Sequence, residues 1–150
     1  MEIITWGFRC LVTAAVLILL AMAARIDMVT KRIPDRILLC IALLGAVSWG
    51  LFLEHGLMDR LAGMVIISLP MFLLALALEG AFGGGDVKLM AAGGFLLGWR
   101  AVSLAALIGL GAGGIYCVVM LAAGKRKLKD RIAFGPFLSL GLALALLTEL

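Results

Sequence analysis

The sequence predicts an all-α integral membrane protein, a bundle of six transmembrane helices that forms one domain over residues 1–150. Hydrophobic residues make up 65% of the chain and charged residues 15%, against roughly 45–50% and about 25% in soluble globular chains. The mean hydropathy is +1.22, and a soluble chain of this length has too little interior to bury so much apolar surface. Uncharged runs long enough to cross a bilayer also recur along the chain.

Five of these runs are long enough to span without help, because a helix crosses a bilayer with roughly 20 apolar residues and tolerates about 17–25. They cover residues 3–24, 37–53, 61–78, 101–124 and 132–148. The first run contains Arg9, which can extend toward the nearer surface, and its acidic amino end is unlike that of a cleaved signal peptide. One further run, the fourth in chain order, has an uncharged core of only residues 89–99, and it spans only if Asp86 and Lys88 form its first turn.

The basic residues predict how this bundle sits in the membrane. When the helices are counted along the chain, ten of the 13 Lys and Arg residues fall on one side, and Arg9, Arg60 and Arg100 fall on the other. By the positive-inside rule, the basic linkers face the cytoplasm and both termini lie on the outer side. The net charge of +4 therefore reflects topology rather than a nucleic-acid partner. The basic linker at residues 125–131 suits contact with anionic membrane lipids.

The cysteines and glycines predict packing rather than chemistry. Cys10, Cys40 and Cys117 each lie in an apolar run without a CxxC pair, so they are interpreted as small buried residues and not as metal ligands. The spacing of Gly109 and Gly113 indicates a helix-packing face inside the bundle. No Ser/His/Asp set, HExxH, P-loop or dinucleotide-binding motif is present, and no metal or cofactor is predicted.

Two carboxylates are the candidates for chemistry, because acids at a membrane boundary are costly unless paired or hydrated. Asp27 lies just past the first predicted helix and Asp86 begins the fourth, so two spans separate them and both face the cytoplasm. Two converging carboxylates can share a proton, one acting as general base toward water and the other as general acid. Alternatively, each acid caps a helix or pairs with Arg25 or Lys88. Spacing alone favours neither interpretation.

The glycines before Asp86 favour the catalytic interpretation. Gly83, Gly84 and Gly85 precede it directly, and three glycines disfavour helix at the membrane boundary. Non-helical backbone at that depth is tolerated where it lines a wet cavity or is buried in protein. Glycine also allows close approach of an extended peptide.

Three neighbouring residues are expected to shape this site. Lys88 lies two residues after Asp86. It is interpreted as an anchoring residue or as a positive charge that sets the local electrostatic field, and not as a nucleophile. Asp35 follows Pro34 at the start of the second predicted helix. Since proline keeps the residue before it extended, Asp35 is expected to be the N-cap of that helix.

Three motifs, in order along the chain, resemble those of bacterial type IV prepilin peptidases. Residues 83–90, Gly-Gly-Gly-Asp-Val-Lys-Leu-Met, are similar to the family's GxGD-Val-Lys-Leu signature. Asp27, followed by Ile33-Pro34-Asp35, resembles its first-aspartate segment. Residues 134–138, Phe-Gly-Pro-Phe-Leu, resemble its carboxy-terminal element. A bare GxGD is a weak signal, but the three motifs together on a six-helix scaffold are specific.

The resemblance implies a GxGD-type aspartic endopeptidase of the bacterial cytoplasmic (inner) membrane. Its substrates would be prepilins or pseudopilins, pilin-like secretion subunits, whose short basic leader is cut off after a glycine at the cytoplasmic face. Asp27 and Asp86 would be the catalytic pair, with Gly83 and Gly85 shaping the loop of the second. Water held between the carboxylates would attack directly, without a metal or cofactor.

Many members of that family also carry an amino-terminal region with two CxxC zinc pairs and methylate the new amino terminus. This chain begins almost directly with its first predicted helix and contains no CxxC. Peptidase activity without methyl transfer is therefore expected.

Two other functions compete with this one. A small membrane transporter or assembly subunit could use Asp27 and Asp86 as a proton or cation site, since broken helices with nearby acids mark transport sites. Such sites lie near the midplane of the bilayer, whereas the sequence places both acids at one edge. A related protease acting on other substrates, such as preflagellins, is the second alternative.

Overall fold

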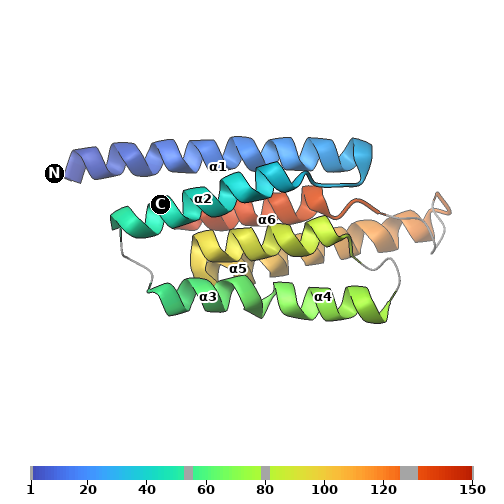
Figure 1. Cartoon of the computed structure of the whole chain (residues 1–150). Helices are drawn as coiled ribbons and strands as arrows, with labels where there is room; N and C mark the ends of the chain where they lie inside the picture. The colour runs from blue at the N-terminus through green and yellow to red at the C-terminus, as the bar shows by residue number, and fades with distance from the viewer. Residues whose placement is uncertain (1, 53–55, 79–81, 126–131, 150) are drawn as a thin grey trace.

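The computed structural model describes residues 2–52, 56–78, 82–125 and 132–149, and within these ranges all regular structure is helical. Figure 1 shows an elongated bundle whose helices run roughly along one common axis. In chain order the helices are α1 (Glu2–Thr30), α2 (Asp35–Phe52), α3 (Leu57–Ile66), α4 (Ser68–Ala77), α5 (Gly84–Ala122) and α6 (Gly135–Thr148).

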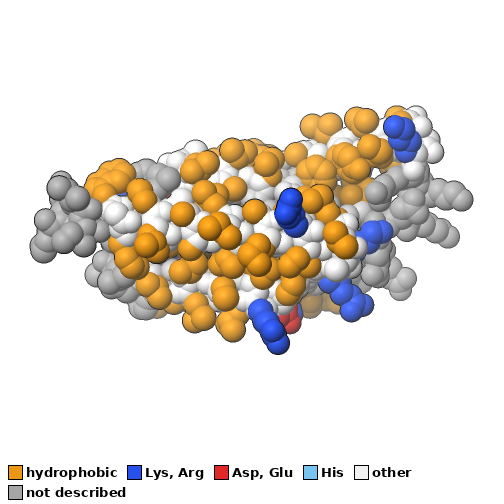
Figure 2. Space-filling model, turned by 90° about the horizontal axis from the view of Figure 1, so that it is seen from above, with side chains coloured by type: hydrophobic (Ala, Val, Ile, Leu, Met, Phe, Trp, Pro, Cys, Tyr) orange, Lys and Arg blue, Asp and Glu red, His pale blue; other side chains and the backbone are white. Residues whose placement is uncertain are grey.

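The outer surface of the bundle is apolar. Three stretches, Trp6–Thr30, Leu57–Ala77 and Gly84–Ala122, are long and apolar enough to cross a membrane. Hydrophobic side chains cover most of the face in Figure 2, and Lys and Arg gather toward its right-hand half. Apolar side chains such as Leu107 point outward with 73% of their surface exposed, which suits lipid and not water. The prediction of an all-helical, multi-pass membrane protein is therefore confirmed.

A single glycine joins the runs predicted for the fourth and fifth helices. Within α5, Gly98 has φ 81° and ψ 175°, outside the helical region, and a residue with a side chain would be strained there. α6 packs against both halves of α5, through Leu142 on Gly93 and Leu138 on Gly109. The chain therefore reverses direction at Gly98, as Figure 1 shows where α5 changes from yellow to orange.

The third predicted run, residues 61–78, consists of two helices in the structure. The helical region begins earlier, at Leu57, and is interrupted between α3 and α4 at Ile67. Pro70 explains the interruption, because proline has no backbone N–H and its ring crowds the carbonyl of Ile66, four residues before it.

Glycines let α6 pack closely on the second half of α5. A Cβ at Gly109 would lie 2.9 Å from the carbonyl oxygen of Phe137, and one at Gly113 would lie 2.6 Å from the ring of Phe134. These two glycines form the packing face within the bundle that their spacing predicted. Leu138, on α6 beside them, is fully buried.

The prediction that the cysteines are buried was wrong. Cys10 and Cys40 are exposed and Cys117 is half-buried. The reason is physical: lipid is as apolar as a protein core, so an apolar run does not reveal which of its faces points inward.

Arg60 is buried inside the bundle, although sequence reasoning counted it only as one of the outer basic residues. Its side chain is 3% exposed. Its Nη1 donates to the carbonyl oxygens of Gly45 at 2.9 Å, Leu96 at 3.2 Å and Phe95 at 3.3 Å. The last two belong to the turn of α5 before Gly98, where carbonyls lack intrahelical donors. The guanidinium therefore ties α3 to α2 and to the end of the first half of α5.

Removing this guanidinium should destabilise the fold. We expect Arg60→Met to lower the free energy of unfolding by about 1–3 kcal/mol, because buried carbonyls lose their donor. Arg60→Lys should recover only part of this loss, because an ammonium lacks the planar fork of arginine. Denaturant titration in mixed micelles measures both, with Arg100→Met as control because Arg100 lies exposed over the Trp99 ring. Equal losses for Arg60→Met and Arg100→Met would contradict this role.

Candidate active site

The two aspartates singled out by the sequence come together at one end of the bundle. Asp27 lies in the last turn of α1 and Asp86 in the first turn of α5. Both are buried, with 4% and 6% of their surface exposed, and they are close enough to interact electrostatically. In Figure 1 this is the end where α1 finishes and where α2, α5 and α6 begin.

Asp27 is held by the amino end of α6. Its Oδ2 accepts the backbone N–H of Gly135 at 3.0 Å. Gly135 is the first residue of α6, and N–H groups at a helix start have no intrahelical acceptor. A Cβ at position 135 would lie 2.5 Å from that same Oδ2, so only glycine allows this approach. Pro136 follows in the first turn, where proline is compatible with a helix.

Asp86 is held by its own turn through one oxygen only. Its Oδ2 accepts the N–H of Gly83 at 3.1 Å, and Gly83 is the N-cap of α5. Its Oδ1 is buried and has no hydrogen-bond partner within the described part of the chain. A buried carboxylate oxygen in this state is ready to bind a water or a substrate group, because leaving it unsatisfied costs free energy.

The three glycines before Asp86 differ in what surrounds them. A Cβ at Gly85 would lie 3.1 Å from Cβ of Ile33, and one at Gly83 would lie 3.2 Å from Oδ2 of Asp86. A Cβ at Gly84 would meet no atom within 4 Å. The first and third glycines therefore pack the turn against Asp86 and against the segment that links α1 to α2, whereas the middle glycine faces outward.

An aromatic cluster, which sequence reasoning missed, joins the two halves of the site. Phe82 and Phe134 meet edge to face with their ring centroids 5.5 Å apart. Each of these residues directly precedes a glycine whose N–H binds a catalytic candidate: Gly83 for Asp86 and Gly135 for Asp27. The cluster continues from Phe134 to Phe137 and from there to Tyr116 on α5. The Phe-Gly-Pro-Phe motif was a signal for its α6 part, but no sequence pattern identified Phe82 as the partner.

Lys88 and Asp35 form an ion pair with each other and not with the catalytic candidates, and Pro34 lies directly before α2. Lys88 Nζ lies 2.8 Å from Asp35 Oδ1, with both side chains mostly exposed. Pro34 provides the carbonyl that accepts the N–H of Ile37, so the predicted capping role of Asp35 was wrong. Asp35 is the first helical residue of α2, one position beyond the cap, and its carboxylate is attracted to the facing ammonium.

Neither catalytic candidate has a cationic partner among the residues that the structure describes. Lys88 pairs with Asp35 and not with Asp86. Asp27 contacts the Gly135 N–H rather than Arg25. Pairing with a nearby cation therefore does not apply here. The other half of that alternative does apply, because each carboxylate caps a helix start: Asp27 caps α6, and Asp86 caps α5 by accepting the backbone N–H of its N-cap residue.

The Lys88–Asp35 ion pair should matter little for stability. Because it is exposed, the coupling between Lys88→Gln and Asp35→Asn in a double-mutant cycle should be below about 1 kcal/mol. Denaturant titration of both single variants and the double variant measures it. A coupling above about 2 kcal/mol would show that the pair is shielded from water more than its exposure indicates.

Comparison with known proteins identifies the relatives of this chain. The sequence profile of the Type IV leader peptidase family matches residues 14–118. A prepilin leader peptidase/N-methyltransferase of Burkholderia pseudomallei is 37% identical over 129 residues, covering 82% of this chain and 41% of that protein. The proteins of the same name from Stutzerimonas stutzeri and Escherichia coli are 34% and 32% identical, over 98% and 77% of this chain and 48% and 53% of theirs.

This chain thus spans about half the length of the curated relatives it matches. No solved structure matches it.

Proposed function

Because the chain belongs to the type IV leader peptidase family, we propose that it is a membrane aspartic endopeptidase that removes the short basic leader from type IV prepilins or pseudopilins. The observation that carries this proposal is the buried pair Asp27 and Asp86, each held by one backbone N–H from a helix start. These contacts hold both carboxylates at the same end of the bundle, and within the described residues Oδ1 of Asp86 has no hydrogen-bond partner, which supports a role in binding water.

The proposed reaction is hydrolysis by direct attack of water. One carboxylate is ionised and takes a proton from the water molecule, while the oxygen of that water attacks the scissile carbonyl carbon. The other carboxyl, protonated, donates to the carbonyl oxygen. The C–N bond of the tetrahedral intermediate then breaks: the leaving amine takes up the proton held by one carboxyl, and one hydroxyl of the intermediate returns its proton to the other carboxylate, which restores the singly protonated pair. Only Asp27, Asp86 and water take part in these steps.

We also propose that the chain crosses a bacterial inner membrane six times with both termini outside. Its crossings would be α1, α2, α3 with α4, the two halves of α5, and α6. Arg25, Lys31, Arg36 and Lys125 are exposed in the segments around the end of the bundle that carries the aspartates, and α1 begins at the opposite end (Figure 1). The positive-inside rule then places the aspartates at the cytoplasmic face, where exposed cations would meet anionic lipids.

Transport is the less favoured function. Asp27 lies in the last turn of α1 and Asp86 in the first turn of α5, whereas ion sites of transporters lie near the middle of the bilayer. The relatives described above carry the name of a peptidase.

Cleavage by the purified protein tests the proposed function. The substrate is a prepilin-like protein with a basic leader, a glycine, a phenylalanine and an apolar helix, and mass spectrometry of the products locates the cut. We expect one cut, directly after the glycine, and none in a matched substrate with valine in place of that glycine. An intact substrate after incubation with folded protein would overturn the proposal.

The rate of cleavage should depend on pH in a bell shape. Because the reaction needs one ionised and one protonated carboxyl, the rate falls at low pH, where both are protonated, and at high pH, where both are ionised. The measurement is kcat/KM in detergent between about pH 4 and about pH 9. A profile with one limb only would contradict a shared proton.

A further inference from the structure

A cavity of about 670 Å³ lies on the outer side of the bundle between α2 and the first half of α5. Its walls are mostly apolar: Leu38, Leu39 and Ala42 from α2, Ala91, Ala92 and Phe95 from α5, and Met64 from α3, with Arg36 and two other charged residues also lining it. Positions that differ by three, four and seven residues share one face of a helix. The cavity, named here the α2–α5 groove, is therefore bounded mainly by one face of α2 and one face of α5, with Met64 of α3 beside them.

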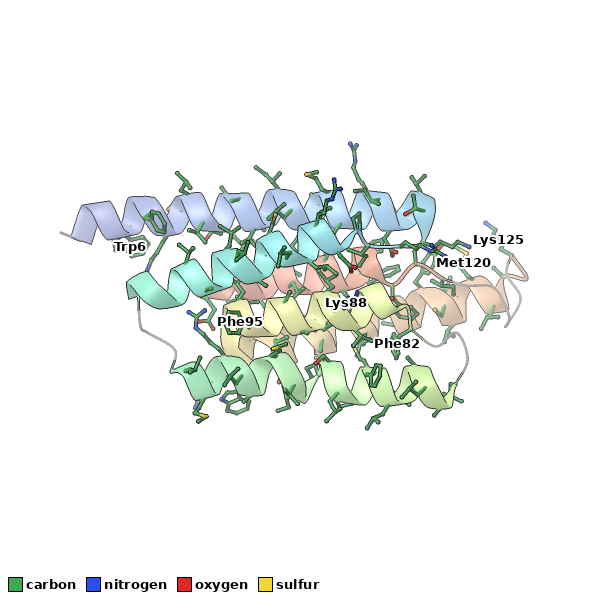
Figure 3. All side chains as sticks on the ribbon, in the orientation of Figure 1. Trp6, Phe82, Lys88, Phe95, Met120 and Lys125 are labelled. Carbon is green, nitrogen blue, oxygen red and sulfur yellow. The ribbon has the colours of Figure 1, made fainter. Side chains whose placement is uncertain are left out.

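The groove begins at the same end of the bundle as the catalytic candidates. Lys88 and Asp35 line it and form their ion pair across it. Lys88 lies two residues after Asp86, at the start of the second turn of α5. From Lys88 the groove runs along α5 to Phe95, near the other end of this half-helix (Figure 3). This separation of seven residues along the helix corresponds to a groove length of about 10 Å.

Among the residues that the structure describes, the interior of the bundle next to the aspartates is closely packed and leaves no room for a long segment. Leu89 on α5 and Leu138 on α6, each one turn beyond the residues that form the site, are 0% exposed. A helix about 10 Å wide cannot pass between side chains packed in this way. A substrate segment that continues from the site into the bilayer must therefore lie on the outer surface.

We propose that the α2–α5 groove receives the apolar helix that follows the cleavage point of the substrate. This proposal rests on the proposed function. Ala42, Ala91 and Ala92 allow the backbone of a partner helix to approach closely, as small residues do at helix contacts within membranes. An occupying helix would start beside Lys88, at the depth where the cut is made.

The open side of the glycine turn provides the connection between groove and site. Asp86 and Lys88 point to different sides of α5, because residues two apart on a helix do not share a face. Gly84, the first residue of α5, is exposed at the amino end of the helix, and a Cβ there would meet no atom within 4 Å. About three extended residues span the width of a helix, so the residues around the cut can cross the amino end of α5 at Gly84 to reach Asp86.

Filling the groove tests the proposal on two substrates. Ala91→Phe should lower kcat/KM at least about tenfold for the full prepilin-like substrate and less than about twofold for a short peptide that ends a few residues after the cut. Ala21→Phe, on an exposed face of α1, is the matched control and should change neither. Equal rates for wild type and Ala91→Phe on the full substrate would overturn the groove proposal alone. A wild type that cleaves neither substrate would overturn the proposed function and this proposal with it.

Photo-crosslinking keeps the test decisive if Ala91→Phe fails to fold. Benzoyl-phenylalanine is placed at position 39, an exposed wall of the groove, in an Asp86→Asn background that retains the substrate. We expect an adduct that maps to the apolar helix of the prepilin-like substrate. Adducts only with phospholipid, adducts only with a second copy of the chain, or no adduct would each overturn the proposal.

Discussion

Asp27→Asn and Asp86→Asn should each lower the rate of leader cleavage at least about 10³-fold, because each removes one of the two proton-transferring groups. The double variant should be no slower than either single variant by more than a small factor, since groups that act as one unit are not additive. Single-turnover cleavage of the prepilin-like substrate in detergent measures these rates. Additive losses would indicate that the two carboxylates act independently.

These variants should remain folded, which separates a catalytic role from a structural one. An Asn oxygen can still accept the N–H of Gly135 or Gly83, and a neutral amide is cheaper to bury than an unpaired charge. We therefore expect free energies of unfolding within about 1 kcal/mol of wild type, or higher than wild type. Asp59→Asn, in the first turn of α3, is the matched control and should retain full activity. Unfolding of both catalytic variants would contradict the proposed role of the pair.

Gly135→Ala should also reduce cleavage strongly, by at least about 10²-fold. The new Cβ would lie 2.5 Å from Oδ2 of Asp27 and 2.8 Å from its Cγ, so either the carboxylate or the start of α6 must move. Overpacking of this kind costs about 1–3 kcal/mol of stability. Cleavage assays and denaturant titration measure the two effects.

Gly111→Ala provides the matched control for that substitution. A Cβ at Gly111 would meet no atom within 4 Å, and Ala in place of Gly inside a helix stabilises it by about 0.5–1 kcal/mol. Activity should therefore be unchanged and stability slightly higher. If Gly135→Ala behaved in the same way, the tight approach of α6 to Asp27 would not matter for cleavage.

Composition and hydropathy were sufficient to predict the membrane class and the helical runs. A chain that is 65% hydrophobic must present apolar side chains to its surroundings, and in lipid only helices or closed barrels satisfy the backbone. The structure and the family match confirm an all-helical membrane protein and a leader peptidase relative. Counting helices also predicted that Asp27 and Asp86 belong to the same end, since parity depends only on the order of the runs.

Local sequence was less informative about which face of a helix is buried. The cysteines were predicted inside and two of them lie outside. Arg60 was considered only for the side of the membrane on which it lies, and no pattern predicted that its guanidinium is buried inside the bundle. Lipid and protein interior are both apolar, so the 3.6-residue periodicity that distinguishes the faces of a soluble helix is weak here.

The partners of the catalytic candidates follow from contacts between residues distant in sequence. Gly135, which donates to Asp27, lies 108 residues away from it. The ring of Phe134 meets that of Phe82, beside the turn that holds Asp86. A sequence shows which residues can form a helix start or approach closely, because these properties are local. Which helix start faces which carboxylate is decided only when α1, α5 and α6 pack, since that choice minimises voids and unsatisfied groups over the whole bundle.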